Sequence, residues 1–214
     1  DRVIKTGSPM YEVLNKFLLK IKASKIIDKL ELTKNKFFVV SAHREENISS
    51  QRNLNGLIDS LNQIAKLYNY PVILSAHPRT RNMINDKNIK THKNIHILKP
   101  LGFLDYNCLQ MNSLAVLSDS GTINEESSIL NFRALNLRDA HERPEAMEEA
   151  SVMMVGMNTD RILQGLKEIS HQEINGLRNF RVVSDYSMPN VSLKVVRIII
   201  SYIDYINQNI YKKF

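Results

Sequence analysis

A run of serine, glycine and threonine between an apolar segment and a helical pattern is the first place where this sequence could do chemistry. The apolar segment, Leu114–Leu117, is too short for a helix and suits a strand covered on both faces. Gly121 allows a tight backbone and the close approach of a ligand, and Ser120 and Thr122 can cap the helix expected over Ile123–Leu130. Free N–H groups at a helix start favour an anion such as phosphate, although an ordinary capped helix explains the same residues equally well.

A second polar cluster follows the apolar segment Phe37–Ala42. It contains His43, Arg44 and Glu46, at the point where a strand would continue into a loop. A histidine there can hydrogen-bond a phosphate or a leaving group, and the guanidinium of Arg44 forms a fork that suits phosphate or carboxylate. The alternative is a loop histidine whose hydrogen bonds are satisfied by its neighbours.

Two glutamates and one arginine complete the set of candidates. Glu125 and Glu126 point about 100° apart on a helix, so one can face a ligand while the other faces solvent or an arginine. A carboxylate near a phosphate needs a separate task, such as accepting the two hydroxyls of a ribose, and the alternative is a solvated helix face. Arg143 could hold a pyrophosphate, or it could form a salt bridge with Glu142 or Glu145.

The elements that must position these residues alternate along the chain. The expected strands are Phe37–Ala42, Pro71–Ala76, Asn94–Leu98, Leu114–Leu117, Ala134–Leu137 and Ser151–Val155. The expected helices are Tyr11–Leu30, Asn53–Tyr68, Arg81–Asn85, Phe103–Met111, Ile123–Leu130, one from Pro144, Asp160–Ile169 and Val191–Asn209, with a weakly structured segment at Asn175–Pro189. This alternation predicts an α/β fold, a Rossmann-like parallel sheet with helices on both faces, in which ligands bind beyond the carboxyl ends of the strands.

Composition sets the class of protein. The 214 residues are 43% apolar and 24% charged, which is ordinary for a globular protein. Cys108 is the single cysteine, so no internal disulfide is possible and a reducing, cytoplasmic setting is expected. Cys and His show no metal-site spacing, and we expect neither a metal nor a cofactor.

Charge and hydropathy argue against two classes of partner. The net charge of +7 is dispersed and not clustered with aromatic residues, which argues against nucleic acid binding. The longest apolar candidate, Val195–Tyr205, is shorter than the ~20 residues needed to span a bilayer and contains charged residues, so no membrane span is expected. The chain begins without methionine and with what resembles a strand end, and we expect it to be a piece of a longer one.

Three motifs in one order resemble the non-hydrolysing UDP-N-acetylglucosamine 2-epimerases. They are HREEN (His43–Asn47), DSGTINEE (Asp119–Glu126) and HERPE (His141–Glu145). The resemblance covers nearly the whole chain and implies the carboxyl-terminal of two Rossmann-like domains, one half of a glycosyltransferase-B-type enzyme whose active site lies between the domains. Residues 1–190 would form the UDP-binding domain, and the long helix in 191–214 would cross back onto the amino-terminal domain.

The resemblance also implies an activity and roles for residues. The family exchanges epimers at C2 of the sugar by eliminating UDP and adding it back, and its proton-transferring acids belong to the domain outside this chain. By motif match, His43 would assist departure of the diphosphate, and the other substrate-binding positions would be Arg44, Glu46, Pro100, Phe103, Ser120, Gly121, Thr122, Glu126 and Arg143. Within that set the turn residues would hold the phosphates, Glu126 the ribose, Arg143 the pyrophosphate, and the segment from Pro100 to Phe103 the uracil.

The sequence is also compatible with another substrate and with two other functions. The segments PLGFLDY, ALNLRDAHERPE and DYSMPNVS are more similar to a branch that makes UDP-N-acetyl-L-fucosamine for capsule or O-antigen. A glycosyltransferase of the same architecture would also bind a nucleotide ribose with a carboxylate, and a non-catalytic UDP-sugar binding module is a third hypothesis. In each case the expected ligand is a UDP-sugar, and the full-length protein is expected to be a homodimer.

Overall fold

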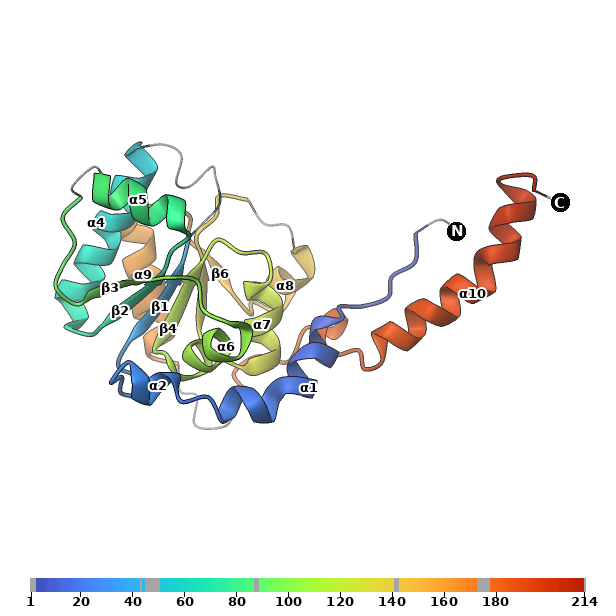
Figure 1. The fold of residues 1–214 in the computed structure, drawn as a ribbon, viewed down its shortest axis with the longest axis horizontal. Helices are drawn as coiled ribbons and strands as arrows, with labels where there is room; N and C mark the ends of the chain where they lie inside the picture. The colour runs from blue at the N-terminus through green and yellow to red at the C-terminus, as the bar shows by residue number, and fades with distance from the viewer. Residues whose placement is uncertain are drawn as a thin grey trace.

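The fold is a twisted parallel sheet between two layers of helices (Figure 1). The computed structural model describes residues 3–42, 44, 51–86, 89–140, 143–172 and 178–213. The six strands follow the order β3-β2-β1-β4-β5-β6, and all neighbouring pairs are parallel. The α/β fold class predicted from the sequence is therefore confirmed.

The strands are short and apolar on both faces. They are β1 (Phe38–Ser41), β2 (Val72–Ser75), β3 (Ile95–Leu98), β4 (Ala115–Ser118), β5 (Ala134–Asn136) and β6 (Met153–Met154). Ser41 of β1 pairs in register with Ser118 of β4, which in turn pairs with Asn136 of β5. These three polar residues therefore mark one level, the carboxyl edge of the sheet. The sixth strand is shorter than the predicted Ser151–Val155, because only Met153 and Met154 pair with β5.

One face of the sheet is covered by three helices, α4 (Gln51–Tyr68), α5 (Pro78–Asp86) and α9 (Thr159–Ser170). The strand side chains that point into this layer include Val40, Leu74, Leu117 and Leu135. Helix α9 lies very close to the sheet at Gly165, where an added Cβ would lie 3.0 Å from atoms of Leu135 and Val155.

The opposite face is covered by α1 (Met10–Lys22), α2 (Ile26–Lys29), α6 (Phe103–Asn112), α7 (Ile123–Leu130) and α8 (Pro144–Glu148). The alternate strand residues, among them Val39, Ile73, Val116 and Ala134, pack into this second layer. Because neighbouring residues of a strand point to opposite faces, a strand buried on both sides must be apolar throughout. Helices α6 and α7 bring their amino-terminal ends to the carboxyl edge of the sheet.

Two predicted helices differ from those observed. The single helix predicted over Tyr11–Leu30 is wrong, because the chain breaks between α1 and α2 at Ser24. The Ser24 hydroxyl accepts a hydrogen bond from the Ile26 N–H (3.2 Å) and donates one to Asp105 (2.6 Å), which replaces the regular helical pattern with a local turn. Helix α5 begins at Pro78, earlier than the predicted Arg81, because proline is tolerated in a first helical turn.

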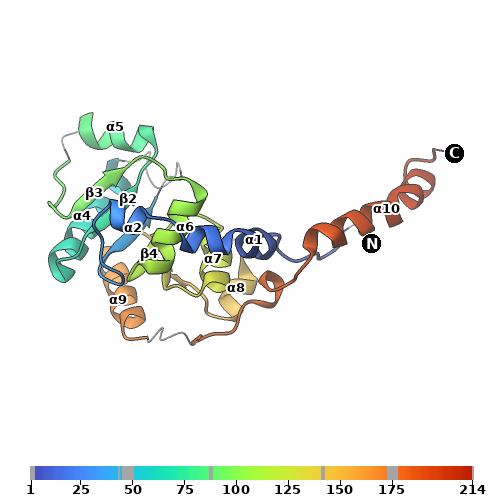
Figure 2. The ribbon, with the colours of Figure 1, turned by 60° about the horizontal axis from the view of Figure 1, so that its bottom comes forward.

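The carboxyl-terminal part contains a short ordered element and a long helix. The segment predicted to be weakly structured includes a 3-10 helix, η1 (Ser184–Tyr186), and Val183 and Tyr186 belong to the second core layer. Helix α10 (Val191–Asn209) has the predicted bounds and extends away from the body of the protein, on the side where the amino terminus also lies (Figures 1 and 2). Of its residues, only Val191 is buried.

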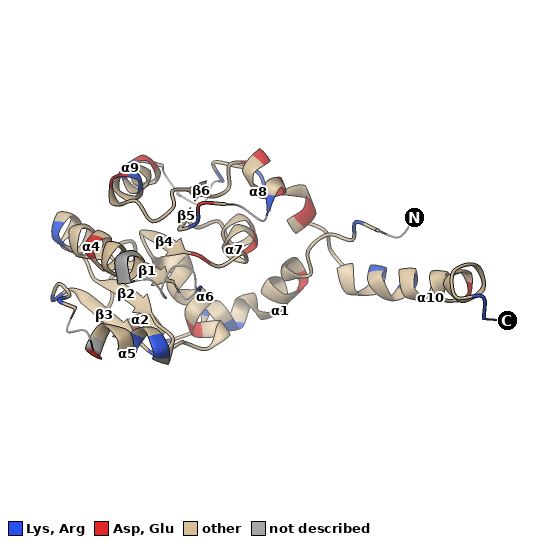
Figure 3. Ribbon diagram, turned by 90° about the horizontal axis from the view of Figure 1, so that it is seen from above, with Lys and Arg blue, Asp and Glu red and all other residues tan. Residues whose placement is uncertain are grey.

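Helix α10 carries few charged residues (Figure 3), and its exposed apolar side chains include Leu193, Val196, Ile199, Ile200 and Ile203. Within the described residues, none of the helices has the length and hydropathy that crossing a membrane would require. The assignment of residues 191–214 to a helix that docks on an amino-terminal domain stays a prediction.

Candidate active site

The turn after β4 is tied to the loop after β1 by a buried aspartate. Asp119 is fully buried, its backbone N–H donates to the Ser41 carbonyl (3.1 Å), and its carboxylate accepts from the Arg44 N–H (2.9 Å). This contact joins residues that lie 75 positions apart in the chain. It fixes the Arg44 backbone beside the turn, because β1 and β4 are adjacent parallel strands and both loops leave the same edge of the sheet.

Hydroxyl groups shape the turn itself. The Ser118 hydroxyl accepts from the Ser120 N–H (3.1 Å), and the Ser120 hydroxyl accepts from the Thr122 N–H (3.3 Å) and lies 3.0 Å from the Thr122 hydroxyl. In the described part of the chain, the N–H groups of Gly121, Ile123 and Asn124 donate no hydrogen bond. The start of α7 therefore presents the donors that an anion site requires.

Of the two residues predicted to cap α7, Ser120 does accept a backbone N–H at the start of the helix, that of Thr122, whereas the prediction is wrong for Thr122. Thr122 occupies the N-cap position, but its backbone is already helical (φ −71°, ψ −14°), and its side chain makes no capping hydrogen bond. A cap normally needs an extended backbone so that its oxygen can reach the next turn. Gly121 is also not among the described residues with positive φ, so its contribution is the missing side chain and not an unusual backbone angle.

Glu126 is buried, and its side chain is hydrogen-bonded to the neighbouring helix α6. Its side chain accepts a hydrogen bond of 2.9 Å from the amide of Gln110 on α6. Burial raises the pKa of the Glu126 carboxyl, and hydrogen bonds from Gln110 and Thr122 oppose that rise. Tyr106, one turn before Gln110, lies in the same cluster, and burial together with the Glu126 charge raises the pKa of its hydroxyl. The alternative of a solvated helix face is therefore wrong for Glu126.

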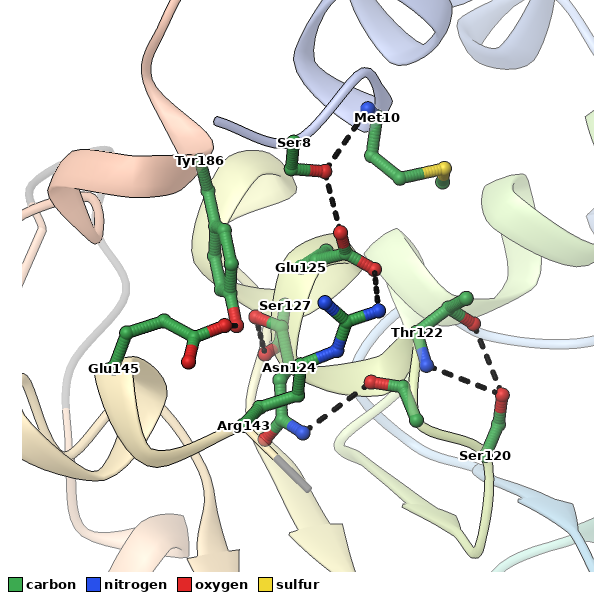
Figure 4. A network of polar contacts seen from close by, with 11 residues as sticks. Ser8, Met10, Ser120, Thr122, Asn124, Glu125, Ser127, Arg143, Glu145 and Tyr186 are labelled. Carbon is green, nitrogen blue, oxygen red and sulfur yellow. Dashed lines mark hydrogen bonds and ion pairs between the residues drawn. The ribbon is translucent and has the colours of Figure 1, made fainter. Parts of the chain in front are cut away.

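Glu125 has a different environment, shown in Figure 4. It is 3% exposed and accepts a hydrogen bond from the Ser8 hydroxyl, and its Oε2 lies 3.6 Å from Nη2 of Arg143. The two glutamates thus point to different partners, and the arginine neighbour expected for one of them is Arg143. Arg143 thus pairs with Glu125 and not with the suggested Glu145, which accepts from the Tyr186 hydroxyl (2.8 Å). Glu142, the other suggested partner, lies outside the described residues.

Two segments distant in sequence meet beside these residues. The Ser8 N–H donates to the Asp185 carbonyl (2.7 Å), and the Lys194 ammonium donates to the carbonyls of Lys5 and Thr6 (both 3.2 Å). A cavity of about 470 Å³ opens here and is lined in part by Ser8, Glu125, Arg143, Glu145 and Tyr186. The segment that precedes α1 and the segment that leads into α10 are therefore fastened to each other next to the candidate site.

The remaining predicted residues lie at the same edge or outside the described chain. Pro100 is exposed, and Phe103 begins α6 with 40% exposure and its ring edge-on to that of Phe17 (6.0 Å). Their position after β3 brings them to the carboxyl edge of the sheet. His43 and Glu46 lie outside the described residues.

Sequence reasoning missed Gln110, Tyr106 and Ser8. Gln110 and Tyr106 are four residues apart and therefore share one face of α6. Glutamine is rarely buried, so a glutamine next to the core residues Cys108 and Leu109 was the sequence signal that could have identified this position. Nothing in the local sequence indicates that Ser8 contacts Glu125, because the two residues lie 117 positions apart.

A second cavity, of about 210 Å³, lies at the amino edge of the sheet and is lined by Arg133, Arg178 and Arg181, among others. Each arginine has a structural contact. Arg133 donates to the Gln172 carbonyl, Arg178 to the carbonyls that end α7, and Arg181 pairs with Glu149 at 2.5 Å. These cations stabilise helix ends and the protein surface, so the carboxyl edge remains the better candidate for an active site.

Comparison with known proteins agrees with this geometry. The model of the UDP-N-acetylglucosamine 2-epimerase family matches residues 1–200. The chain belongs to this family. The 2-epimerase of Rickettsia bellii is 44% identical to it, with a TM-score of 0.89, over 97% of this chain and 56% of that one.

Two further structures relate the chain to the family and to a wider fold. The 2-epimerase of Neisseria meningitidis, solved with UDP-GlcNAc bound, is 28% identical with a TM-score of 0.76, over 94% of this chain and 56% of that one. The Escherichia coli ADP-heptose heptosyltransferase II, at 13% identity and a TM-score of 0.53, covers 71% of this chain and 51% of that one, and it shows a likeness of fold alone. This chain therefore has the fold of one half of a glycosyltransferase-B-type architecture. It spans about half the length of the curated relatives it matches, from 39% to 54% for four of them.

Proposed function

We propose that this chain is the UDP-binding half of an enzyme that interconverts UDP-N-acetylglucosamine and UDP-N-acetylmannosamine. The observation that carries the proposal is the set of groups at the carboxyl edge of the sheet. Unbonded N–H groups at the start of α7, the half-exposed Arg143 and the buried carboxylate of Glu126 lie on adjacent elements. Diphosphate and ribose need donors, a cation and an acceptor in that combination.

Each group has a stated task in the proposal. The turn from Ser120 to Thr122 binds the phosphates through its N–H and hydroxyl groups. Arg143 binds the pyrophosphate, where it neutralises the charge that develops as UDP departs. Glu126 accepts hydrogen bonds from the ribose hydroxyls, and the segment from Pro100 to Phe103 contacts the uracil. These assignments follow the family motifs and agree with the burial and contacts of the described residues.

Chemistry at C2 requires further residues. Removing an unacidic proton from the sugar needs a positioned acid and base, and none of the groups around the turn fits that task, since Glu125 and Glu126 are both held by other contacts. We assign the proton transfers to the other half of the full-length enzyme. His43 would assist departure of the diphosphate, and Arg44 and Glu46 would contribute to substrate binding.

The proposal is tested by separating binding from turnover. The 214-residue chain and a longer chain with the amino-terminal half are titrated with UDP and then assayed for exchange of the C2 proton of UDP-N-acetylglucosamine with solvent deuterium. We expect both chains to bind UDP and only the longer one to incorporate deuterium. Robust exchange by the short chain would contradict the assignment of roles, and the absence of UDP binding by the long chain would contradict the proposal itself.

The substrate can be settled in the same assay. Several relatives and solved structures are named as UDP-N-acetylglucosamine 2-epimerases, and this favours UDP-N-acetylglucosamine over the 6-deoxy sugar that would give UDP-N-acetyl-L-fucosamine. Faster C2 exchange with the 6-deoxy substrate would reverse that preference. Transfer of the sugar to an acceptor would instead identify a glycosyltransferase.

Two other expectations stay predictions. A homodimer of the full-length protein would be detected by sedimentation velocity, and a cytoplasmic location by fractionation of the source cells. Neither affects the assignment of the nucleotide site.

A further inference from the structure

The contact between Gln110 and Glu126 is a polar pair inside the second core layer. Gln110 has no exposed surface, and its amide donates to Oε2 of Glu126 at 2.9 Å. The neighbouring residues on α6, Cys108 and Leu109, are buried core residues. Burying an amide is costly unless it is hydrogen-bonded, and apolar side chains would pack α6 against α7 without that cost. The pair therefore needs an explanation beyond the stability of the two helices.

The geometry restricts what Glu126 can do. With one carboxylate oxygen bonded to Gln110, the carboxylate cannot rotate freely at the start of α7. The ionised form is the better partner for two hydroxyls, because it accepts at both oxygens, whereas a protonated carboxyl uses one oxygen as a donor. Burial favours the protonated form, and the Gln110 amide and the Thr122 hydroxyl favour the ionised form.

The other titratable groups near Glu126 do not replace Gln110. On α7 the neighbouring Glu125 raises the pKa of Glu126 through like charge. On α6 the Tyr106 hydroxyl, whose pKa is raised by burial, carries no positive charge that could favour the ionised form of Glu126. Among the described residues, the Gln110 amide thus contributes most to lowering the pKa of Glu126 against the effect of burial.

We propose that Gln110 is a positioning residue that holds the Glu126 carboxylate ready for the ribose, and that it thereby sets the preference for ribonucleotides over 2′-deoxyribonucleotides. This inference rests on the proposed function, in which Glu126 binds the ribose hydroxyls. It adds a residue that does not touch the nucleotide, and it adds a property that can be measured, the ratio of affinities for UDP and 2′-deoxy-UDP.

The test is a titration of the full-length protein with UDP and 2′-deoxy-UDP between pH 5.5 and 8.5. Since hydrogen bonds to charged groups are strong, the wild-type protein should bind UDP at least about 10-fold more tightly than 2′-deoxy-UDP. Gln110→Met removes the amide while nearly conserving the volume, and the ratio should fall by at least about 5-fold. Without the amide donor, Glu126 protonates at higher pH. UDP affinity should therefore decline earlier as pH falls, while the affinity for 2′-deoxy-UDP changes less.

Controls separate positioning from packing. Leu109→Met alters the packing of the same helix and should leave both the ratio and the pH profile unchanged. If Gln110→Met does not fold, Gln110→Glu keeps the size of the side chain and places a second carboxyl beside Glu126. It should lower the ratio and raise the pH below which UDP binding is lost.

The outcomes are distinct. A wild-type ratio and pH profile in either Gln110 variant would overturn the inference and leave the proposed function intact. A wild-type protein that binds UDP and 2′-deoxy-UDP equally would overturn the assignment of Glu126 to the ribose, and the inference with it.

Discussion

Replacing Arg143 should weaken binding of the diphosphate and leave binding of the nucleoside unchanged. Arg143 lies at the N-cap of α8, where Pro144 restricts its backbone, and its side chain is 39% exposed. Its distance of 3.6 Å from Glu125 exceeds hydrogen-bond range, so the guanidinium is oriented by charge and can still donate to a ligand. An isolated pair of unit charges at about 4 Å is worth about 4 kcal/mol at an effective dielectric constant of about 20.

The measured effect will be smaller than that Coulomb energy. Glu125 neutralises part of the charge of Arg143, and both the arginine and the diphosphate lose water on binding. Measured hydrogen bonds to charged groups contribute about 1.5–3 kcal/mol, which corresponds to a loss of about 10-fold to 150-fold in UDP affinity for Arg143→Gln. Arg143→Lys keeps the charge but loses the fork and should fall between the wild type and Arg143→Gln.

Isothermal titration of the full-length protein with UDP, UMP and uridine provides the assay. Arg143→Gln should reduce affinity most for UDP, and should change uridine affinity by less than about 3-fold, because uridine carries no phosphate. Arg181→Gln is the matched control, since Arg181 also pairs with a glutamate but lines the cavity at the opposite edge of the sheet. An equal loss for uridine and UDP, or an equal effect of Arg181→Gln, would refute the reasoning.

Three further predictions concern the stability of the fold and the binding of the uracil base. Gly165→Ala should destabilise the fold by about 1–3 kcal/mol in urea unfolding, because the added Cβ would lie 3.0 Å from side chains of the sheet. Gly56→Ala on α4, where an added Cβ would meet no atom within 4 Å, should be neutral or stabilising by up to about 1 kcal/mol. The reverse order of the two variants would contradict the packing of α9 on the sheet. Ser8→Ala removes a donor from the buried Glu125 and should cost about 1–3 kcal/mol, seen as a lower urea midpoint with unchanged slope, so an unchanged midpoint would count against this contact. Phe103→Ala should weaken uridine and UDP alike, by about 5-fold to 100-fold, if the exposed ring stacks on uracil, and a loss confined to UDP would exclude that role.

The fold could be predicted because its signals are local. Each interior strand is a short apolar run that ends in polar residues, as in Phe37–Ala42 and Leu114–Leu117, and a parallel sheet covered on both faces requires that pattern. The break between α1 and α2 could not be predicted, because it depends on the contact of Ser24 with Asp105 of a distant helix. Apolar periodicity continues across the break and predicts one helix.

The candidate site was predicted in part. Residues at strand ends, such as Arg44 and those of the turn from Ser120 to Thr122, could be found from their positions after apolar runs, and Asp119 joins the two groups. The environments of Glu125 and Glu126 could not be found in this way. Their partners, Ser8 and Gln110, come from other elements, and only tertiary packing brings them within hydrogen-bond distance. The roles of His43 and Glu46 stay predictions.

The central claim is that the turn after β4 holds the diphosphate of UDP, and a crystal structure of the full-length protein with UDP tests it most directly. We expect the phosphate oxygens within hydrogen-bond distance of the N–H groups of Gly121 and Ile123, with Arg143 at the pyrophosphate and both ribose hydroxyls on Glu126. A nucleotide bound in the cavity at the amino edge, beside Arg133 and Arg178, would contradict the account.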